Sequence, residues 1–249
     1  MKKRWVLLFV LLLGTIPAGF APFMDGLASA ADASTKQWLQ ISSEIRYYGE
    51  VANGKPHGRG TMTWSENKKY SGDFVNGKRS GTGTYMNTYV DFDSSRLHEV
   101  KYIGSWKNDR MNGEGTQTEK ITENDFDQTV TLNEIKKGMF KDNKFVKGYD
   151  VAHGLYDPDF NFVYKDQDTY LEIMHGNKNL VHNWRSGDLM GITYKRGAVI
   201  YDYGAIPYEN NEIAEKQRRV ALMHLRTFTK EVTPHLNQFE YLSKLVPLR

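Results

Sequence analysis

The sequence predicts a mainly β protein made of successive β-hairpin repeats and ending in helices. A motif of tyrosine, glycine and an Asn-Gly turn recurs between residues 47 and 148, and strand-like segments continue to residue 206. After Pro207 the apolar residues change from the spacing of strands to the spacing of helices. With 22 glycines and 15 tyrosines in 249 residues, the chain is rich in turn-forming and strand-forming residues.

The first thirty residues have the pattern of a secretory signal peptide. Positive charges at residues 2–4 precede an apolar run at 5–13, and Ala28-Ser29-Ala30 supplies a small-residue cleavage site. We therefore expect cleavage after Ala30 and a mature protein that is secreted or associated with the cell envelope. The short signal and the absence of cysteine are typical of a bacterial exported protein. The alternative is an uncleaved anchor extending to Met24, because that stretch approaches the ~20 residues needed to span a bilayer.

The charge balance narrows the kinds of partner. The formal net charge of +3 belongs mostly to the signal, because residues 31–249 hold 30 basic and 29 acidic residues. A nearly neutral mature chain has no bulk attraction to nucleic acid, so we expect no nucleic-acid partner. The chain has no cysteine, which excludes disulfides, thiolate metal sites and cysteine nucleophiles.

Three copies of one motif define the repeat region. The motif runs Tyr-x-Gly-x-Val or aromatic, then a two-residue turn, then Gly-x-Gly, and occupies residues 47–61, 70–84 and 102–116. The second copy starts 23 residues after the first, and the third starts 32 residues after the second. A weaker fourth copy at 137–148 has lost the leading tyrosine and the paired glycines. A fixed motif repeated at this spacing predicts a repeat architecture.

Each part of the motif has a physical role. Asn-Gly pairs between extended runs favour tight hairpin turns, because both residues tolerate positive φ. A glycine between two large side chains leaves room for an aromatic ring of a neighbouring hairpin to lie across the backbone. Because a single hairpin is marginal in water, the hairpins must stack to bury their aromatic row. The residues with these structural roles are Gly49, Asn53, Gly54, Gly58, Gly60, Gly72, Asn76, Gly77, Gly81, Gly83, Gly104, Gly113 and Gly115.

The motif resembles the MORN repeat (membrane occupation and recognition nexus). The shared features are the Tyr-x-Gly-x-aromatic run, the Asn-Gly-Lys turn and the Gly-x-Gly pair, and they cover less than half of the chain. The resemblance implies a single-layer, ribbon-like antiparallel sheet with no activity of its own. It also implies an association with phospholipid headgroups, protein scaffolding or self-association.

Two segments are longer than the linkers of this family. Residues 86–100 and 117–135 interrupt the period and are rich in acidic residues and threonine. They form either longer hairpins that project from one edge or solvated loops, and the sequence favours loops.

Beyond residue 148 the motif is lost and the strand pattern persists. We expect strands at 160–164, 169–174, 189–194 and 198–203, with a hairpin turn at 195–197. A helix at 208–229 should end at Pro234, and Leu236, Phe239, Leu242 and Val246 indicate a short second helix. We expect these helices to cap the sheet, whose open end needs a cover. The predicted organisation is a signal peptide at 1–30, a lead-in at 31–46, repeats at 47–148, further hairpins and degenerate repeats at 149–206, and a helical cap at 207–249.

No catalytic motif is present, and we expect neither a metal nor a cofactor. His175 and His182 are seven residues apart, a spacing that gives no reason for a shared metal. The segment from Asp157 to Asp168 faintly resembles a calcium-binding loop, but Phe162 stands where a glycine is required. A β-turn opened by Asp-Pro is the better interpretation.

These observations favour a non-enzymatic scaffold that binds a protein or assembles with itself. The expected contact surface is an exposed aromatic face made by Tyr47, Tyr70, Phe74, Tyr102 and Trp106. The alternative is peripheral binding to anionic phospholipid headgroups through the turn lysines Lys55, Lys78 and Lys107. A third hypothesis, an enzyme with its site in residues 150–249, would need a polar pocket that sequence does not reveal.

Overall fold

The computed structural model describes residues 35–92, 95–125, 128–154, 159–189, 191–203 and 212–246. These residues belong to one compact unit, Ser34–Arg249. The expected signal peptide at 1–30 and the start of the lead-in lie outside the described residues. Within the described ranges, no helix has both the length and the apolar character needed to cross a membrane.

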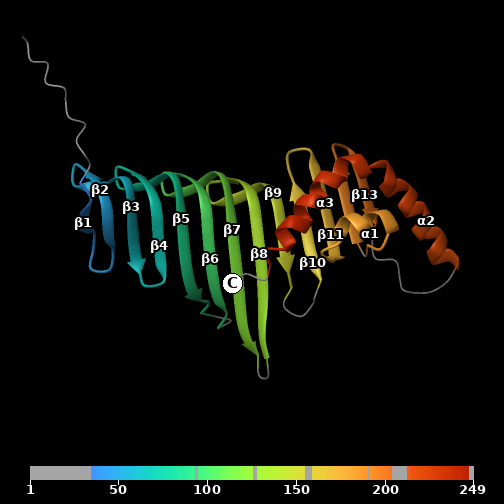
Figure 1. The fold of residues 1–249 in the computed structure, drawn as a ribbon, viewed down its shortest axis with the longest axis horizontal. Coiled ribbons are helices and arrows are strands. Elements are labelled where there is room, and N and C mark those ends of the chain that lie inside the picture. Colours follow the sequence, from blue (N-terminus) through green and yellow to red (C-terminus); the bar gives the residue numbers. More distant parts are fainter. Residues whose placement is uncertain are drawn as a thin grey trace, which may run out of the picture. The chain divides into compact units, whose positions relative to one another are not determined.

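The strands of the described ranges form one antiparallel sheet of thirteen strands, and their order in space follows their order in the chain (Figure 1). The strands are β1 (Gln37–Gln40), β2 (Arg46–Ala52), β3 (Lys55–Ser65), β4 (Lys68–Val75), β5 (Lys78–Val90), β6 (Leu97–Lys107), β7 (Arg110–Asp125), β8 (Gln128–Lys141), β9 (Lys144–His153), β10 (Phe160–Lys165), β11 (Thr169–Gly176), β12 (Gly191–Arg196) and β13 (Val199–Tyr203). The helices are α1 (Leu180–Ser186), α2 (Glu212–Thr227) and α3 (Thr229–Ser243). The predicted fold class is confirmed.

The hairpin turns form where the sequence predicts them. Asn53 and Gly54 have φ values of 52° and 70°, in the left-handed region that these residue types tolerate. The same conformation recurs in the three later turns, at Asn76–Gly77, Asn108–Asp109 and Asp142–Asn143. The fourth hairpin, β8–β9, therefore keeps the turn of the motif although it has lost the tyrosine.

Each of the three later turns is also joined to the hairpin before it by a backbone hydrogen bond. The N–H groups and their acceptor carbonyls are Gly77 to Pro56 (2.8 Å), Asp109 to Arg79 (3.0 Å) and Asn143 to Met111 (3.1 Å). The turns thus form a continuous bonded row along one end of the strands. This row supplies the stacking that a single hairpin lacks.

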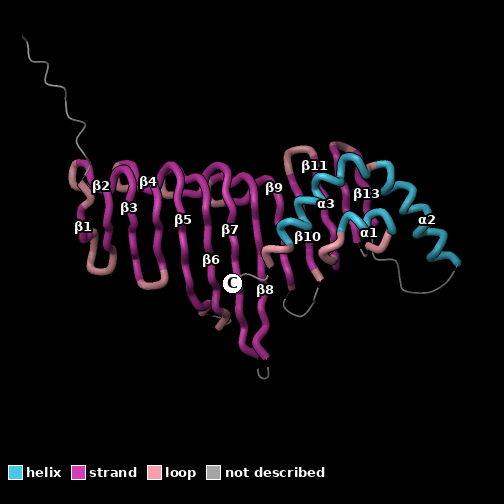
Figure 2. Tube along the Cα trace, in the orientation of Figure 1, coloured by secondary structure: helices cyan, strands magenta, loops and turns pink. Residues whose placement is uncertain are grey.

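The two long segments are strands. Residues 86–100 extend β5 and β6, whose pairing continues to Val90 and Leu97. Residues 117–135 extend β7 and β8, whose pairing continues to Asp125 and Gln128. Figure 2 shows β7 and β8 reaching past the other strands of the repeat region. The longer-hairpin interpretation is confirmed, and the favoured interpretation as solvated loops is wrong, because the described residues of both segments pair as far as Val90–Leu97 and Asp125–Gln128.

The C-terminal part differs from the expectation in two places. The short helix α1, between β11 and β12, was not expected, and the strand predicted at 189–194 is β12, which starts two residues later. Pro234 lies inside α3 and does not end α2. The break between these helices falls at Phe228, whose ring packs against Tyr194 and Tyr201. The boundary therefore lies six residues before the proline, which α3 accommodates.

The sheet carries two hydrophobic cores. The first consists of Tyr47, Met62, Tyr70, Phe74, Tyr102, Trp106 and Phe140. The second joins strands β8 to β12 to the three helices, through residues such as Ile135, Trp184, Leu225 and Phe239. The helices lie across the last strands of the sheet (Figure 1).

Strand pairing places the two cores on opposite faces. Tyr102, Gln117 and Lys136 form one unbroken row of paired residues. Ile135, next to Lys136 in β8, belongs to the second core. Because neighbours in a strand point to opposite faces, the tyrosines and the helices occupy different sides. We call these sides the aromatic face, which bears Tyr47, Tyr70 and Tyr102, and the helix face.

Candidate functional site

The five aromatic residues expected to form a binding surface are buried. Their exposed fractions lie between 0% for Tyr47 and 5% for Trp106. Their rings pack edge to face in one chain, with centroid distances of 5.1 Å for Tyr47–Phe74 and Tyr70–Phe74, 5.2 Å for Tyr70–Trp106 and 5.3 Å for Tyr102–Trp106. The predicted exposed aromatic face is therefore wrong. These rings form the core of the repeat region, where they pack against one another and the tyrosines lie over the glycines of the paired strands.

The glycines of the motif make this packing possible. The ring of Tyr47 lies against Gly49 and Gly60, and a Cβ on Gly49 would lie 2.5 Å from the Tyr47 hydroxyl. The ring comes from the hairpin's own first strand, not from a neighbouring hairpin as expected. The Tyr47 hydroxyl donates to the carbonyl of Glu50 at 2.6 Å. Burial, with a smaller contribution from the Glu50 carboxylate, raises the pKa of Tyr47 to about 12, so the hydroxyl stays a donor.

The glycines also form a row that crosses the sheet from β2 to β9. Each is paired with the next, in the order Gly49, Gly60, Gly72, Gly83, Gly104, Gly115, Gly138 and Gly148. On the aromatic face, tyrosine rings cover part of this row. On the helix face, the row is flanked by side chains of neighbouring positions such as Tyr48, Thr61 and Ser71.

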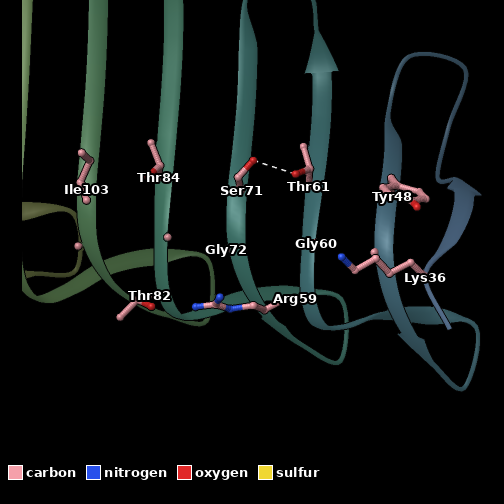
Figure 3. Close-up of a pocket in the computed structure, with 13 residues that line it drawn as sticks. Lys36, Tyr48, Arg59, Gly60, Thr61, Ser71, Gly72, Thr82, Thr84 and Ile103 are labelled. Atoms are coloured by element: carbon pink, nitrogen blue, oxygen red, sulfur yellow. Dashed lines mark hydrogen bonds between the residues drawn. The ribbon is translucent and has the colours of Figure 1, made fainter. Parts of the chain in front are cut away.

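Over the first strands this side of the row is a shallow trough with a cavity volume of ≈ 670 Å³ (Figure 3). Its lining consists of Lys36, Tyr48, Gly49, Arg59, Gly60, Thr61, Ser71, Gly72, Thr82, Gly83, Thr84, Ile103 and Gly104. We call this surface the trough. It lies on strands whose helix face the protein's own helices leave uncovered.

Hydroxyl groups dominate the side chains of the trough. Thr61 and Ser71 come from adjacent strands and are hydrogen bonded at 2.8 Å (Figure 3). Arg59 supplies a positive charge on the side of the trough nearer the hairpin turns, and its Nε lies 3.4 Å from Asp73 Oδ1. The lining residues include no carboxylate and no histidine, and the neighbouring Asp73 carboxylate, which pairs with Arg59, also accepts the N–H and hydroxyl of Thr82 at 2.8 Å and 3.2 Å. The trough therefore offers hydrogen bonds without an acid–base pair.

Apolar side chains stand at the two ends of the trough. Tyr48 and Ile103 are 42% and 50% exposed, and Figure 3 shows them at opposite ends of the lining. Tyr48 is also paired with Trp38, with ring centroids 4.9 Å apart and Trp38 71% exposed. Exposed aromatic and aliphatic groups beside polar ones are typical of contact surfaces.

The hollowed surface continues toward the helices. A second hollow of ≈ 330 Å³ shares Ile103 with the trough and adds Met86, Lys101 and Thr118. A third, of ≈ 250 Å³, lies where α3 meets the sheet, and both Gly148 and Gln238 line it. The Gln238 side-chain N–H group is buried there without a hydrogen-bond partner.

The turn lysines of the lipid hypothesis face solvent. Lys55, Lys78 and Lys107 are all exposed, and each lies beside a hairpin turn of the bonded row. They lie outside the lining of the trough.

The remaining candidates form no site in the described residues. In those ranges, no group of three or more histidine, aspartate or glutamate side chains could hold a metal ion. Asp157 of the calcium interpretation lies outside the described residues. Asp166 organises the turn before β11, since its carboxylate accepts the backbone N–H groups of Asp168 (2.9 Å) and Thr169 (2.7 Å).

Bonded hairpins with tyrosine rings over paired glycines define a β-hairpin repeat protein. The sequence matches the family model of the MORN repeat over residues 47–68, 70–86 and 102–118, so the chain contains MORN repeats in three places. Strand pairing continues beyond these spans, through the weaker fourth copy and on to β13. No curated protein matches the chain.

Sequence reasoning selected the wrong face of the correct strands. Tyr48, Thr61, Ser71 and Thr84, which line the trough, each stand next to a residue that is buried or paired on the aromatic face. Successive side chains in a strand point to opposite faces, so the residue next to each motif tyrosine or glycine could have been assigned to the other face from the sequence.

Proposed function

We propose that this chain is a non-enzymatic scaffold that binds a polypeptide partner through the trough. MORN repeats are associated with protein or lipid binding. The observation that carries the proposal is an open, hydroxyl-lined trough on a sheet whose opposite face is closed by its own aromatic core. A rigid sheet with one free hollowed face suits binding, because little conformational freedom is lost when a partner docks.

The chemistry of the trough favours a polypeptide. Thr61, Ser71 and Thr84 both donate and accept hydrogen bonds, which suits the alternating N–H and C=O groups of a peptide backbone. Tyr48 and Ile103 offer apolar contacts at the two ends. The partner is either another protein or a second copy of this chain.

The test is partner capture by the mature protein from the envelope fraction of its own cells, identified by mass spectrometry. We expect Tyr48→Asp and Ile103→Asp to lose a partner that the wild type retains, since both substitutions place a charge in the contact. Val75→Asp is the matched control, because Val75 is an exposed apolar residue outside the trough. Size-exclusion chromatography of the same variants shows whether the partner is a second copy. Equal recovery of every partner by all three variants would refute the proposal.

A second candidate function is binding to anionic phospholipid headgroups through the row of turns. The exposure of Lys55, Lys78 and Lys107 along successive hairpins favours it. Vesicle binding that weakens with salt and is lost in a Lys55→Gln/Lys78→Gln/Lys107→Gln variant would support this function over the first.

Export is part of the proposal. Its support is the pattern of residues 1–30, with positive charges, an apolar run and a small-residue cleavage site. N-terminal sequencing of the protein recovered outside the cytoplasm should give a chain that begins at Ala31. A chain that keeps Met1 in the membrane fraction would instead support the uncleaved anchor.

A further inference from the structure

Helix α2 carries an exposed apolar stripe. Ile213, Val220 and Met223 are 69%, 48% and 66% exposed. Their spacing of seven and ten residues places them on one side of a helix with 3.6 residues per turn. Ala221 and Leu225, on another side, are buried against the rest of the protein. The helix therefore presents apolar side chains both toward the protein and toward solvent, where the exposed Lys216 and His224 lie on the same side as the stripe.

The described side chains in the first half of α2 are also exposed to solvent. Every side chain described between Glu212 and Val220 is exposed, and the first buried residue is Ala221. In Figure 1, α2 runs past the last strands of the sheet. Helices in folded proteins gain most of their stability from packing an apolar face, and the described side chains of this half bury no such face. An external surface that covers the stripe would supply that packing.

The charges of this segment indicate what kind of external surface covers the stripe. Residues 216–230 contain five basic residues and no acidic residue: Lys216, Arg218, Arg219, Arg226 and Lys230. The two acidic residues of α2, Glu212 and Glu215, both lie in its first turn, where they face the positive end of the helix dipole. An apolar stripe flanked by lysine and arginine suits an interface between headgroups and acyl chains.

We propose that α2 docks in the plane of an anionic lipid bilayer, with Ile213, Val220 and Met223 at the acyl boundary and the basic side chains on the headgroups. The site is separate from both the trough and the turn lysines. It does not depend on the proposed function, because α2 contributes no residue to the trough.

The test places a single reporter on the stripe. Because the chain has no cysteine, Met223→Cys creates one labelling site for an environment-sensitive dye. Vesicles of phosphatidylcholine with a minority of phosphatidylglycerol should shift the dye emission to the blue, and salt should reverse the shift. Phosphatidylcholine vesicles should leave it unchanged. A local reporter is needed because the apolar run at 5–13 could hold the chain on either kind of vesicle. Met86→Cys, on the sheet and 50% exposed, is the matched control and should not shift.

Variants then separate the contributions. In the reporter background, Ile213→Glu should weaken the apparent affinity about tenfold, because it puts a charge at the acyl boundary. Arg219→Gln and Arg226→Gln should each weaken it about fivefold. Lys55→Gln/Lys78→Gln/Lys107→Gln should leave the apparent affinity unchanged. A loss of vesicle binding in this variant would assign lipid binding to the turns.

Three results would overturn the proposal. They are no dye shift at low salt, an equal shift with neutral vesicles, or a stripe variant that binds like the parent while circular dichroism shows unchanged helix content. A shift produced by a soluble acidic protein, but not by anionic vesicles, would identify a protein as the occupant of the stripe and also sink the lipid hypothesis.

Discussion

The repeat region and the C-terminal region bury opposite faces of the same sheet. In the repeat region the core is a row of edge-to-face aromatic rings, closed by hairpin turns that bond to one another. In the C-terminal region the core is mainly aliphatic and is closed by helices. A single sheet needs one buried face along its length. The repeat region buries its face under aromatic rings, and the C-terminal region buries the opposite face under helices.

Strand β8 is where the buried face changes. It contributes Phe140 to the aromatic core and Ile135 to the helical core. Lys136, two residues before Gly138, takes the place that tyrosine has in the first three copies, and its Nζ lies 3.7 Å from Asp150 Oδ2. The fourth copy thus has a Lys–Asp ion pair where the first three copies have a buried tyrosine ring.

The change of face also decides which surface is free. The helices cover the helix face beside β8 to β12. The same face beside the first strands keeps the trough open. A sheet covered by helices throughout would have no such surface.

The largest expected effect comes from removing a ring that joins the helices to the sheet. Phe239→Ala should lower the free energy of unfolding by about 3–5 kcal/mol, since Phe239 is 0% exposed and packs against Tyr149 and Phe162. Hydrogen exchange should show faster exchange in β9–β12 than in β2–β5, if the two cores are separate stabilising units. Uniform acceleration across the sheet would show one cooperative core and contradict the comparison.

The next effect tests the closure of the aromatic face. Gly72→Ala should cost about 3 kcal/mol, because a Cβ there would lie 2.5 Å from the Cα of Gly83 in the paired strand. Gly77→Ala is the control, since a Cβ on Gly77 would meet nothing within 4 Å. Its φ of 83° alone should cost about 1 kcal/mol. Urea denaturation of both variants measures the difference, and equal losses would mean that close packing at Gly72 is unimportant.

The fold is largely predictable from sequence, because the turn residues and glycines act locally. Asn53-Gly54 specifies a turn wherever it occurs between strands, and the glycine pairs indicate close approach of backbones. Which face of the sheet is buried is harder to predict, because it depends on whether aromatic rings or helices pack against it. Pro234 shows another limit of local rules, since it was expected to end a helix and instead lies inside α3. The trough could not be predicted from residues taken singly, because its lining side chains come from several adjacent strands.

A smaller effect should follow from a cation inside the aromatic core. The guanidinium of Arg79 lies 4.3 Å from the ring centroid of Trp106, and its Nε lies 3.2 Å from Asp109 Oδ1 in the next turn. Arg79→Met should cost about 2 kcal/mol, although the third copy has Met111 at the equivalent position.

Arg110→Met is the control for Arg79→Met. Arg110 forms a similar pair with Asp142, with both side chains more than half exposed, and its loss should cost less than about 1 kcal/mol. Thermal unfolding checks both variants. If the two substitutions cost the same, the aromatic surroundings of Arg79 add nothing.

The smallest effect concerns the polar end of the aromatic face. Burial, together with the nearby Glu134 carboxylate, raises the pKa of Asp150 to about 7 in the folded protein, against the opposing charges of Lys136 and Lys165. The folded state therefore holds a proton that the unfolded state releases near pH ~4, and stability falls as pH rises from about 4 to about 7. Asp150→Asn stays neutral at all pH values, so it should flatten this decline and stabilise the protein above pH ~7 by about 1 kcal/mol. Urea denaturation across that pH range measures the slope. A variant with the wild-type slope would show that Asp150 ionises without cost, and that the aromatic face at β9 is open to solvent.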